Sequence, residues 1–478
     1  MSSYLNEPVL EIAPPAPTPG VWSTIREAVR GSSIDYTTAP LGRAIVMLAV
    51  PMVLEMAMES IFAVADVFWV AHLGADAVAT VGLTESMMTI VYTLAMGLSI
   101  GATAVVARRI GERDHDGASR AAVQSILLGL LVSAAMATIG IRYGAALLRV
   151  MGASDSVVAT GSGFTRMLLG GNATVVLLFL INAVFRGAGD AAIAMRVLWI
   201  GNAINIVLGP CLIFGLGPFP ALGVTGAAVA TTIGRGTAVV CQMAVLLGGR
   251  GRIGFRIRDI RIDGHVMAAM VRLSGTGTFQ ILLTTASYVA LVRILATFGS
   301  AMLAGYTIAI RVIIFAILPS YGVSNAAATM VGQNLGAGQP ERAERAVWTA
   351  ARYNMVLLGA IGLLFLAAAQ PIVALFTDDP LAQPFAAASL RIVSLGFVFY
   401  AVGMVLTQSF NGAGDTWTPT FINVFIFWVC EIPLAWVLAY RTSLGALGVP
   451  TALAVAYSTL AVVSALVFRR GRWKRMRV

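Results

Sequence analysis

Three carboxylates share one face of a long apolar stretch near the start of the chain. Residues 43–71 read RAIVMLAVPMVLEMAMESIFAVADVFWVA and include Glu55, Glu59 and Asp66. At about 100° per residue, these positions fall within about 40° of one another on a helix. Each carboxylate facing lipid would cost about 2.5 to 3.5 kcal/mol. The stretch therefore predicts a membrane helix whose acidic stripe faces a pathway for cations. The alternative is that these carboxylates are polar contacts between packed helices.

The composition is typical of a polytopic helical membrane protein. Of 478 residues, 58% are hydrophobic and 11% are charged, and the mean hydropathy is +0.85. The apolar runs of about 20 or more residues have the length of membrane helices and lack the alternation of β-barrel strands. The predicted fold class is an all-α polytopic membrane protein with twelve transmembrane helices. The three cysteines lie in apolar runs and the three histidines lack metal-ligand spacing, so we expect no disulfide and no metal centre.

The loops predict the orientation in the membrane. Arginines cluster after the second, sixth, eighth and twelfth apolar runs, whereas the loops after the fifth and seventh runs carry no charge. By the positive-inside rule, both termini are cytoplasmic and the protein is a multi-pass protein of the cytoplasmic (inner) membrane. Arg142, Arg149 and Arg441 depart from this pattern but are too few to reverse it. The net charge of +10 is explained by these loops and by a basic tail, so no nucleic-acid partner is expected.

The chain contains an internal repeat with an offset of 412 − 187 = 225 residues. GAGD at 187–190 recurs at 412–415, and ALGV at 221–224 recurs at 446–449. Six spans per repeat give the two halves the same orientation, as in transporters that work by rocking. The predicted organisation is a partly disordered cytoplasmic tail at 1–40, an N-lobe at 41–247, a cytoplasmic linker at 248–267, a C-lobe at 268–468 and a basic cytoplasmic tail at 469–478.

The membrane carboxylates of the first half have no counterpart in the second. Shifted by 225 positions, Glu55, Glu59, Asp66 and Glu85 become Gln280, Thr284, Leu291 and Ile310, and Asn182 and Asn205 become Thr407 and Cys430. Carboxylates beside neutral oxygens are the groups that proton exchange or Na⁺ binding requires. The first half therefore predicts a polar cluster with a chemical role, because the scaffold alone would be repeated.

Four other residues stand out within the apolar runs. Arg235 is either a charge partner for the acidic stripe or a side chain that extends toward the inner membrane surface. Glu431 is either a substrate-cavity residue or a helix-packing hydrogen-bond partner. Pro51 and Pro433 remove backbone hydrogen bonds within spans and predict bends. GAGD at 187–190 is interpreted as a turn before a helix, not a phosphate loop.

Several motifs resemble those of the multidrug and toxic compound extrusion (MATE) family. VGQNLGAG at 331–338, followed by Glu341, Arg342 and Ala343, is similar to the family signature after the eighth span. ADVFWVAHLG at 65–74, FRGAGD at 185–190 and NIVLGP at 205–210 are similar to segments of its DinF-like branch. The resemblance covers roughly residues 40–468. It implies two six-helix lobes in a V, and efflux of cationic or amphiphilic compounds driven by inward H⁺ or Na⁺.

The resemblance also implies roles for individual residues. Asp66 matches the aspartate of the family's first helix, and Pro51 matches the proline at which that helix bends. Asn182, Asn205 and Thr231 match polar members of an N-lobe cation site, so these three and Asp66 would be the ligands if the ion were Na⁺.

The chain departs from the family pattern at three positions. The DinF-like branch often has Asp where this chain has Gly209, so the usual ligand set is incomplete. Gln280 and Tyr400 stand where the NorM-like branch has a glutamate and an aspartate, which argues against a C-lobe cation site. Glu55 or Glu59 would compensate for Gly209.

The predicted function is multidrug efflux by secondary antiport, with H⁺ favoured over Na⁺ and no cofactor or catalytic residue. The expected cation-coupling residues are Asp66, Glu59, Glu55, Asn182, Asn205 and Thr231, and the expected substrate-cavity residues are Glu85, Arg235, Gln280, Tyr400 and Glu431. We expect a monomer whose partners are the lipid bilayer and small cationic or amphiphilic drug-like compounds. The alternatives are a flippase for lipid-linked saccharides, which would need cationic groups in its cleft, and an intramembrane enzyme or receptor.

Overall fold

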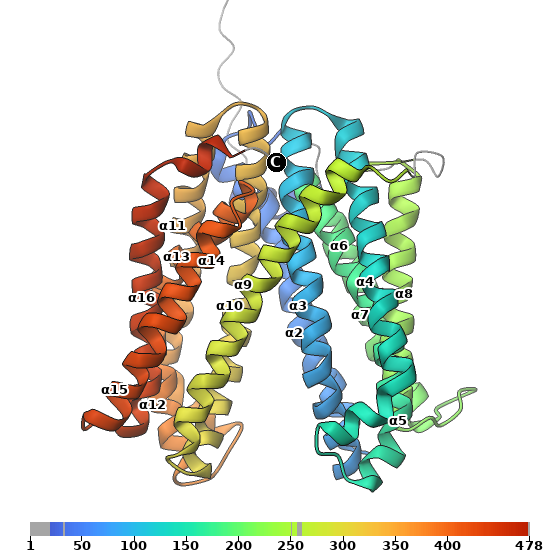
Figure 1. The fold of residues 1–478 in the computed structure, drawn as a ribbon, viewed down its shortest axis with the longest axis vertical. Helices are drawn as coiled ribbons and strands as arrows, with labels where there is room; N and C mark the ends of the chain where they lie inside the picture. The colour runs from blue at the N-terminus through green and yellow to red at the C-terminus, as the bar shows by residue number, and fades with distance from the viewer. Residues whose placement is uncertain (1–19, 32–33, 250, 256–260, 477–478) are drawn as a thin grey trace, which may run out of the picture.

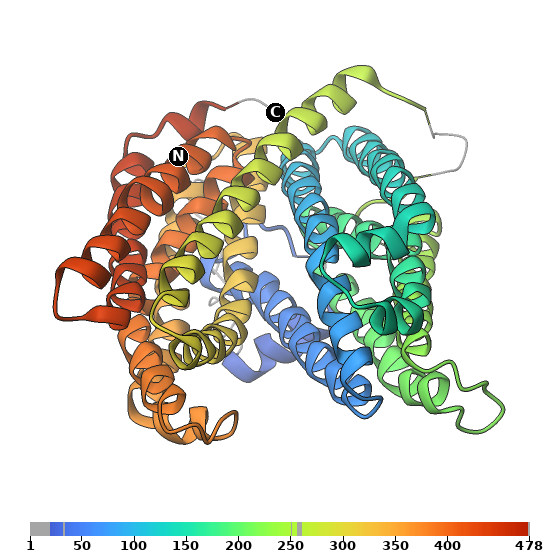
Figure 2. The ribbon, with the colours of Figure 1, turned by 60° about the horizontal axis from the view of Figure 1, so that its bottom comes forward.

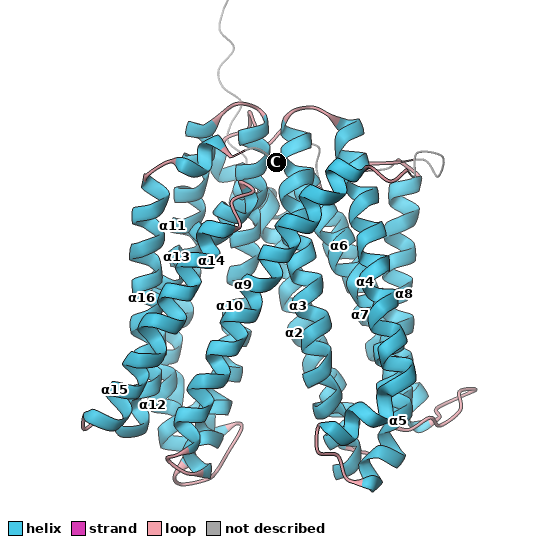
Figure 3. Ribbon diagram, in the orientation of Figure 1, coloured by secondary structure: helices cyan, strands magenta, loops and turns pink. Residues whose placement is uncertain are grey.

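The chain is built almost entirely from long helices. A computed structural model describes residues 20–31, 34–249, 251–255 and 261–476. Within these residues there is no strand (Figure 3), and eleven helical segments are long and apolar enough to cross a membrane. A twelfth span is formed by α12 (Ala382–Leu395) and α13 (Phe397–Gly412), which are bent by 57° at their junction. The predicted all-α polytopic membrane fold is therefore confirmed.

The first repeat begins with a short amphipathic helix and continues into six spans. Its helices are α1 (Val21–Arg30), α2 (Leu41–Ala71), α3 (Ala75–Gly111), α4 (His115–Val150), α5 (Asp155–Gly170), α6 (Asn172–Ala188), α7 (Ala191–Phe214) and α8 (Val224–Leu247). α5 and α6 together make one span. Most of the predicted tail, residues 1–19, lies outside the described residues.

The second repeat has the same order of spans with two irregular segments. Its remaining helices are α9 (Gly264–Ala296), α10 (Ser300–Gly336), α11 (Pro340–Ala374), α14 (Trp417–Asn423), α15 (Ile432–Arg441) and α16 (Gly448–Arg469). A π-helix (Val424–Glu431) joins α14 to α15 directly before Pro433. α11 is kinked at Ala368, three residues before a proline. α2 continues through Pro51 as one helix, so the bend expected there stays a prediction.

The two lobes form a V (Figure 1). They meet at the end that carries the α3–α4 and α10–α11 turns, here called the closed end, and diverge toward the opposite, open end. α9 crosses from the first lobe toward the second, packing against α3 on its way (Figure 2). α2 runs from the closed end to the open end and packs against α7 of its own repeat and α10 of the other.

Two repeat-equivalent glycines explain how the lobes approach each other at the closed end. A Cβ at Gly111 would lie 2.0 Å from the carbonyl oxygen of Gln333, and a Cβ at Gly336 would lie 2.2 Å from that of Arg108. No side chain is compatible with either distance. Since 111 + 225 = 336 and 108 + 225 = 333, the two contacts are one contact made twice by the repeat.

The two motif segments also meet at the closed end. Gln333, in the VGQNLGAG motif of α10, donates through Nε2 to the carbonyl oxygen of Gly187 at 2.9 Å. Thr329, one turn earlier, donates through Oγ1 to the carbonyl oxygen of Arg186 at 3.1 Å. These bonds satisfy carbonyls at the end of α6, where the helix stops because Gly189 takes a left-handed conformation at φ 91°. Segments about 146 residues apart thus form one joint.

Candidate functional site

The carboxylate of Glu55 is the most buried member of the acidic stripe. Its Oε1 lies 2.8 Å from Nη1 of Arg186 and accepts a hydrogen bond from Nδ2 of Asn182 at 2.9 Å. Gln242 of α8 donates in turn to Oδ1 of Asn182 at 2.5 Å. Oε2 of Glu55 has no hydrogen-bond partner among the described residues. α2, α6 and α8 therefore hold Glu55 in an ion pair, which offsets the cost of burying its charge.

The carboxylate of Glu59 lies one turn further along α2 and is only half-buried. Asn202 of α7 donates to its Oε2 at 3.5 Å, the long limit of a hydrogen bond. Nearby, Asn205 of α7 donates through Nδ2 to Oγ1 of Thr231 of α8 at 2.8 Å. Glu59 thus has no cation in direct contact among the described residues, in contrast to Glu55.

Arg235 supplies a buried positive charge beside the stripe. Its Nη1 donates to the hydroxyl of Tyr92 of α3 at 3.1 Å, and its guanidinium lies 5.2 Å from the ring centre of Phe62 of α2. The charges of Glu59 and Asp66 act on it from α2. Arg235 is therefore buried inside the lobe beside the stripe, and its role as a charge partner of the stripe stays a prediction.

Asp66 and Glu85 lie further toward the open end than Glu55 and Glu59 do. Asp66 is half-buried and Glu85 is exposed. The charges of Glu85 and Arg235 act on Asp66, and those of Arg311 and Arg235 act on Glu85. Because Arg311 belongs to α10, Glu85 interacts electrostatically with the opposite lobe.

The four side chains that would hold Na⁺ do not form one bonded cluster. Asn205 and Thr231 bond to each other, but Asn182 bonds to Glu55 and Gln242 instead of lying with Asp66 in one network. Across the described part of the chain, no group of three or more His, Cys, Asp and Glu side chains could hold a metal ion. Beside Gly209 there is open space, because only Cδ1 of Trp69 lies within 4.0 Å of a Cβ placed there.

Of the expected C-lobe residues, Gln280 and Glu431 are buried and Tyr400 is half-buried. Gln280 lies on α9, and Tyr400 of α13 stacks on Tyr457 of α16 with 3.8 Å between ring centres. Glu431 ends the π-helix, and neither of its carboxylate oxygens has a hydrogen-bond partner among the described residues. The helix-packing hydrogen bond considered for Glu431 is therefore not formed.

Sequence reasoning missed several polar partners of the stripe. These are Arg186, Asn202, Gln242 and Tyr92. Shifted by 225 positions they become Asn411, Phe427, Val467 and Ile317. None is repeated, so the comparison between halves that singled out the carboxylates would also have found their partners.

This arrangement is able to move protons or bind a cation. It places three carboxylates along one helix over about 16 Å, with one of them fixed by Arg186 and two without a contacting cation. Amide and hydroxyl groups of α6, α7 and α8 line the same path. The path lies in the first lobe only.

The comparisons with known proteins agree with this architecture. The MatE family model matches residues 51–211 and 278–437, one segment in each repeat and together more than half of the chain. "Probable multidrug resistance protein NorM" of Thermotoga maritima is 24% identical over 91% of this chain and 94% of that protein. "FAD transporter" of Shewanella oneidensis is 23% identical over 83% of this chain and 88% of that protein.

A solved structure has the same fold. It is described as an outward-facing conformation of a multidrug resistance MATE family transporter. The two chains are 27% identical, and the match covers 94% of this chain and 98% of the solved chain with a TM-score of 0.85. Assignment to the DinF-like branch stays a prediction. The family itself is shown, and the chain belongs to the MATE family, whose members are transporters and not enzymes.

Proposed function

We propose that this transporter exports cationic or amphiphilic drug-like compounds in exchange for protons. The observation that carries the proposal is the pair of carboxylates without a contacting cation, Glu59 and Asp66, inside the first lobe. Glu55 is held by Arg186, so it is less free to bind and release an ion. The names of the multidrug relatives support drug-like cargo.

The proposed orientation places the closed end in the cytoplasm. The arginines of the α3–α4 turn and of the C-terminal segment lie at this end (Figure 1), and positive loop charge favours the cytoplasmic side. Both termini would then be cytoplasmic in a multi-pass protein of the inner membrane. The state described would be open to the outside, so a proton from outside reaches Asp66 before Glu55. One chain supplies both lobes, which supports a monomer as the working unit.

The order of events follows from charge. Protonation of Asp66 or Glu59 removes a negative charge from the lobe and so weakens its hold on a cationic substrate, which leaves toward the outside. After the lobes rock to the inward-facing state, loss of the proton restores the charge and the affinity for the next cation. Differential affinity in the two states is what couples the two movements.

The ligand geometry supports H⁺ over Na⁺. A hard cation such as Na⁺ prefers several oxygen ligands at once, whereas a proton needs one carboxylate. Asn182 is engaged by Glu55 and Gln242, Asn205 by Thr231, and Gly209 offers no side chain. Asp66 is left as the one carboxylate of the expected set.

Ethidium transport in inverted vesicles tests the proposal. Vesicles with the wild-type protein should accumulate ethidium when the lumen is acidified at fixed Na⁺, and vesicles with Asp66→Asn should not. Transport that follows an imposed Na⁺ gradient and ignores a proton uncoupler would contradict proton coupling. Equal transport by wild type and Asp66→Asn would contradict the assigned site.

A second candidate is export of an anionic nucleotide-like or lipid-linked cargo. It is favoured by the buried guanidinium of Arg235 and by the relative described as an FAD transporter. The same vesicles separate the candidates, because FAD should then compete with ethidium and Arg235→Gln should abolish FAD uptake.

A further inference from the structure

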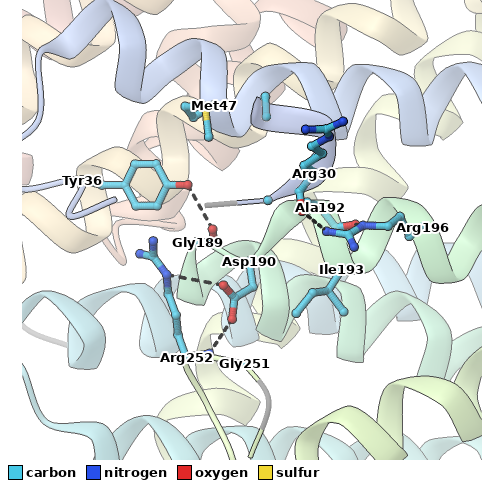
Figure 4. Close-up of a pocket in the computed structure, with 12 residues that line it drawn as sticks. Arg30, Tyr36, Met47, Gly189, Asp190, Ala192, Ile193, Arg196, Gly251 and Arg252 are labelled. Carbon is cyan, nitrogen blue, oxygen red and sulfur yellow. Dashed lines mark hydrogen bonds and ion pairs between the residues drawn. The ribbon is translucent and has the colours of Figure 1, made fainter. Parts of the chain in front are cut away.

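A positively charged pocket lies at the closed end, and none of the stripe carboxylates lines it (Figure 4). It has a volume of about 440 Å³ and is formed by α1, the start of α2, the turn between α6 and α7, and residues 251–252. The charged side chains that line it are Arg30, Arg196, Arg252 and Asp190. Three guanidinium groups against one carboxylate leave the pocket with a net positive charge. Nothing in the proposed transport cycle uses these groups.

The inner part of the pocket is held together by its own bonds. The backbone N–H of Arg252 donates to Oδ2 of Asp190 at 2.6 Å, and its Nε lies 3.4 Å from Oδ1. Tyr36 donates through its hydroxyl to the carbonyl oxygen of Gly189 at 3.1 Å, and the guanidinium of Arg252 lies 4.8 Å from the centre of its ring. Burial raises the pKa of Tyr36 to about 12, so this donor stays neutral at physiological pH. The pocket is therefore preorganised.

Two arginines at the mouth are available to a ligand. Arg30 and Arg196 are exposed, and neither is paired with a carboxylate in the described part of the chain. Arg196 donates through Nη2 to the carbonyl oxygen of Arg30 at 2.5 Å and through Nε to that of Ala192 at 3.3 Å. These bonds fix its plane beside Arg30 and leave Nη1 as a donor. Both arginines line the pocket, and the guanidinium of Arg196 lies beside the backbone of Arg30 (Figure 4). Guanidinium groups are suited to a phosphate because they donate paired N–H bonds and keep their charge.

The surroundings of the pocket are those of a membrane surface. Trp22, Arg26 and Arg30 recur every four residues on the outer face of α1, and the side chain of Trp22 is 84% exposed. Tryptophan beside arginine on a short amphipathic helix is typical of the bilayer interface. Along α7, beyond Arg196, Ile200 and Val207 are 48% and 68% exposed. An apolar surface thus continues from the pocket toward the hydrocarbon region.

We propose that this pocket binds the phosphate of an anionic phospholipid, with Arg30, Arg196 and Arg252 around the headgroup and the acyl chains along α7. Basic pockets at the cytoplasmic ends of membrane helices are suited to such headgroups. A free phosphate shares the chemistry of the headgroup but would gain nothing from the apolar face of α7. The lipid is therefore the source of phosphate that the structure favours.

Lipid titration of the purified full chain tests this site. The chain in neutral detergent is titrated with phosphatidylglycerol, with phosphatidylcholine and with inorganic phosphate, and Tm is measured. Phosphatidylglycerol should raise the Tm of the wild type, and phosphatidylcholine and inorganic phosphate should not. The double variant Arg30→Gln/Arg196→Gln should bind phosphatidylglycerol about 25-fold more weakly, about fivefold for each charge.

Two further variants keep the result unambiguous. Arg120→Gln/Arg345→Gln removes two exposed arginines from the same end of the molecule outside the pocket and should bind as the wild type does. Arg30→Lys/Arg196→Lys keeps the charge but loses the paired N–H donors, so its affinity should fall between those of the wild type and Arg30→Gln/Arg196→Gln. An intermediate affinity separates a lost site from a damaged fold.

Three outcomes would overturn the proposal. Equal stabilisation by phosphatidylglycerol and phosphatidylcholine would remove the anionic requirement. Equal affinity in Arg30→Gln/Arg196→Gln and the Arg120/Arg345 control would place binding elsewhere. Inorganic phosphate binding as tightly as phosphatidylglycerol would assign the pocket to a soluble anion instead of a lipid.

Discussion

Glu55 and Arg186 connect the acidic stripe to the joint between the lobes. The carboxylate of Glu55 lies 2.8 Å from the guanidinium of Arg186, and the carbonyl oxygen of the same Arg186 accepts the hydroxyl of Thr329 from the other lobe at 3.1 Å. A change of charge within the stripe therefore acts on the same residue whose backbone carbonyl takes part in the contact between the lobes at the closed end. This gives the proposed antiport a physical route from ion binding to lobe movement.

Asp66→Asn should abolish proton-coupled efflux. Asn keeps the shape of the side chain but cannot exchange a proton, so expression should stay near normal while drug resistance falls to the level of cells without the transporter. Asp76→Asn is the control, because Asp76 is an exposed aspartate in the first turn of α3 near the same end. Undiminished resistance in Asp66→Asn cells at matched protein levels would contradict the role of Asp66.

Gly209→Asp should introduce a response to Na⁺. The substitution places a carboxylate in open space, where only Trp69 lies within 4.0 Å of the new Cβ, and it restores the residue of the resembled branch. Efflux driven by a Na⁺ gradient at fixed pH should appear in the variant and be absent in the wild type. Gly209→Asn, of equal size without charge, is the control. Sodium-driven efflux in the wild type would show that the missing carboxylate does not decide the ion.

Neutralising Glu59 should impair transport more than changing its repeat equivalent, Thr284. Glu59→Gln removes a negative charge that interacts electrostatically with Arg235. Thr284→Ala removes only a hydroxyl that bonds to a backbone carbonyl of its own helix. Any packing cost should be about 1 kcal/mol at either position. Resistance and the pH dependence of efflux at equal membrane abundance compare the two. Equal losses would mean that the stripe is structural. Glu55→Gln and Gln280→Ala extend the same comparison.

Glu55→Gln and Arg186→Gln should each destabilise the protein strongly. The double variant should lose less stability than the sum of the two single losses. Breaking a buried ion pair leaves an uncompensated charge and typically costs about 3 to 5 kcal/mol, whereas removing both charges costs less. The Tm values of the two single variants and the double variant in detergent measure the coupling. Strict additivity would show that the 2.8 Å contact contributes no net interaction.

The sequence predicted the scaffold better than the partners within it. Apolar runs and the 225-residue offset gave the membrane spans and two lobes, because hydrophobic length and duplication are visible in a linear pattern. The 57° bend between α12 and α13 and the π-helix before Pro433 were not predicted, since they depend on packing between helices. Asn182 was grouped with Asp66 through the resemblance but bonds to Glu55. Which polar side chains contact each other depends on how each helix is rotated about its own axis. That rotation cannot be deduced from the composition of the sequence.

The paired contacts of Gly111 and Gly336 make the joint between the lobes self-complementary. Gly111 contacts Gln333, and Gly336 contacts Arg108. Gly336 is the repeat equivalent of Gly111, and Gln333 is the repeat equivalent of Arg108. This is the geometry of an isologous dimer interface, realised within one polypeptide. Such an interface has a two-fold axis through its centre, which relates the contact at Gly111 to the contact at Gly336. Each lobe therefore contributes the same half of the contact that holds the closed end together, although the acidic stripe lies in the first lobe alone.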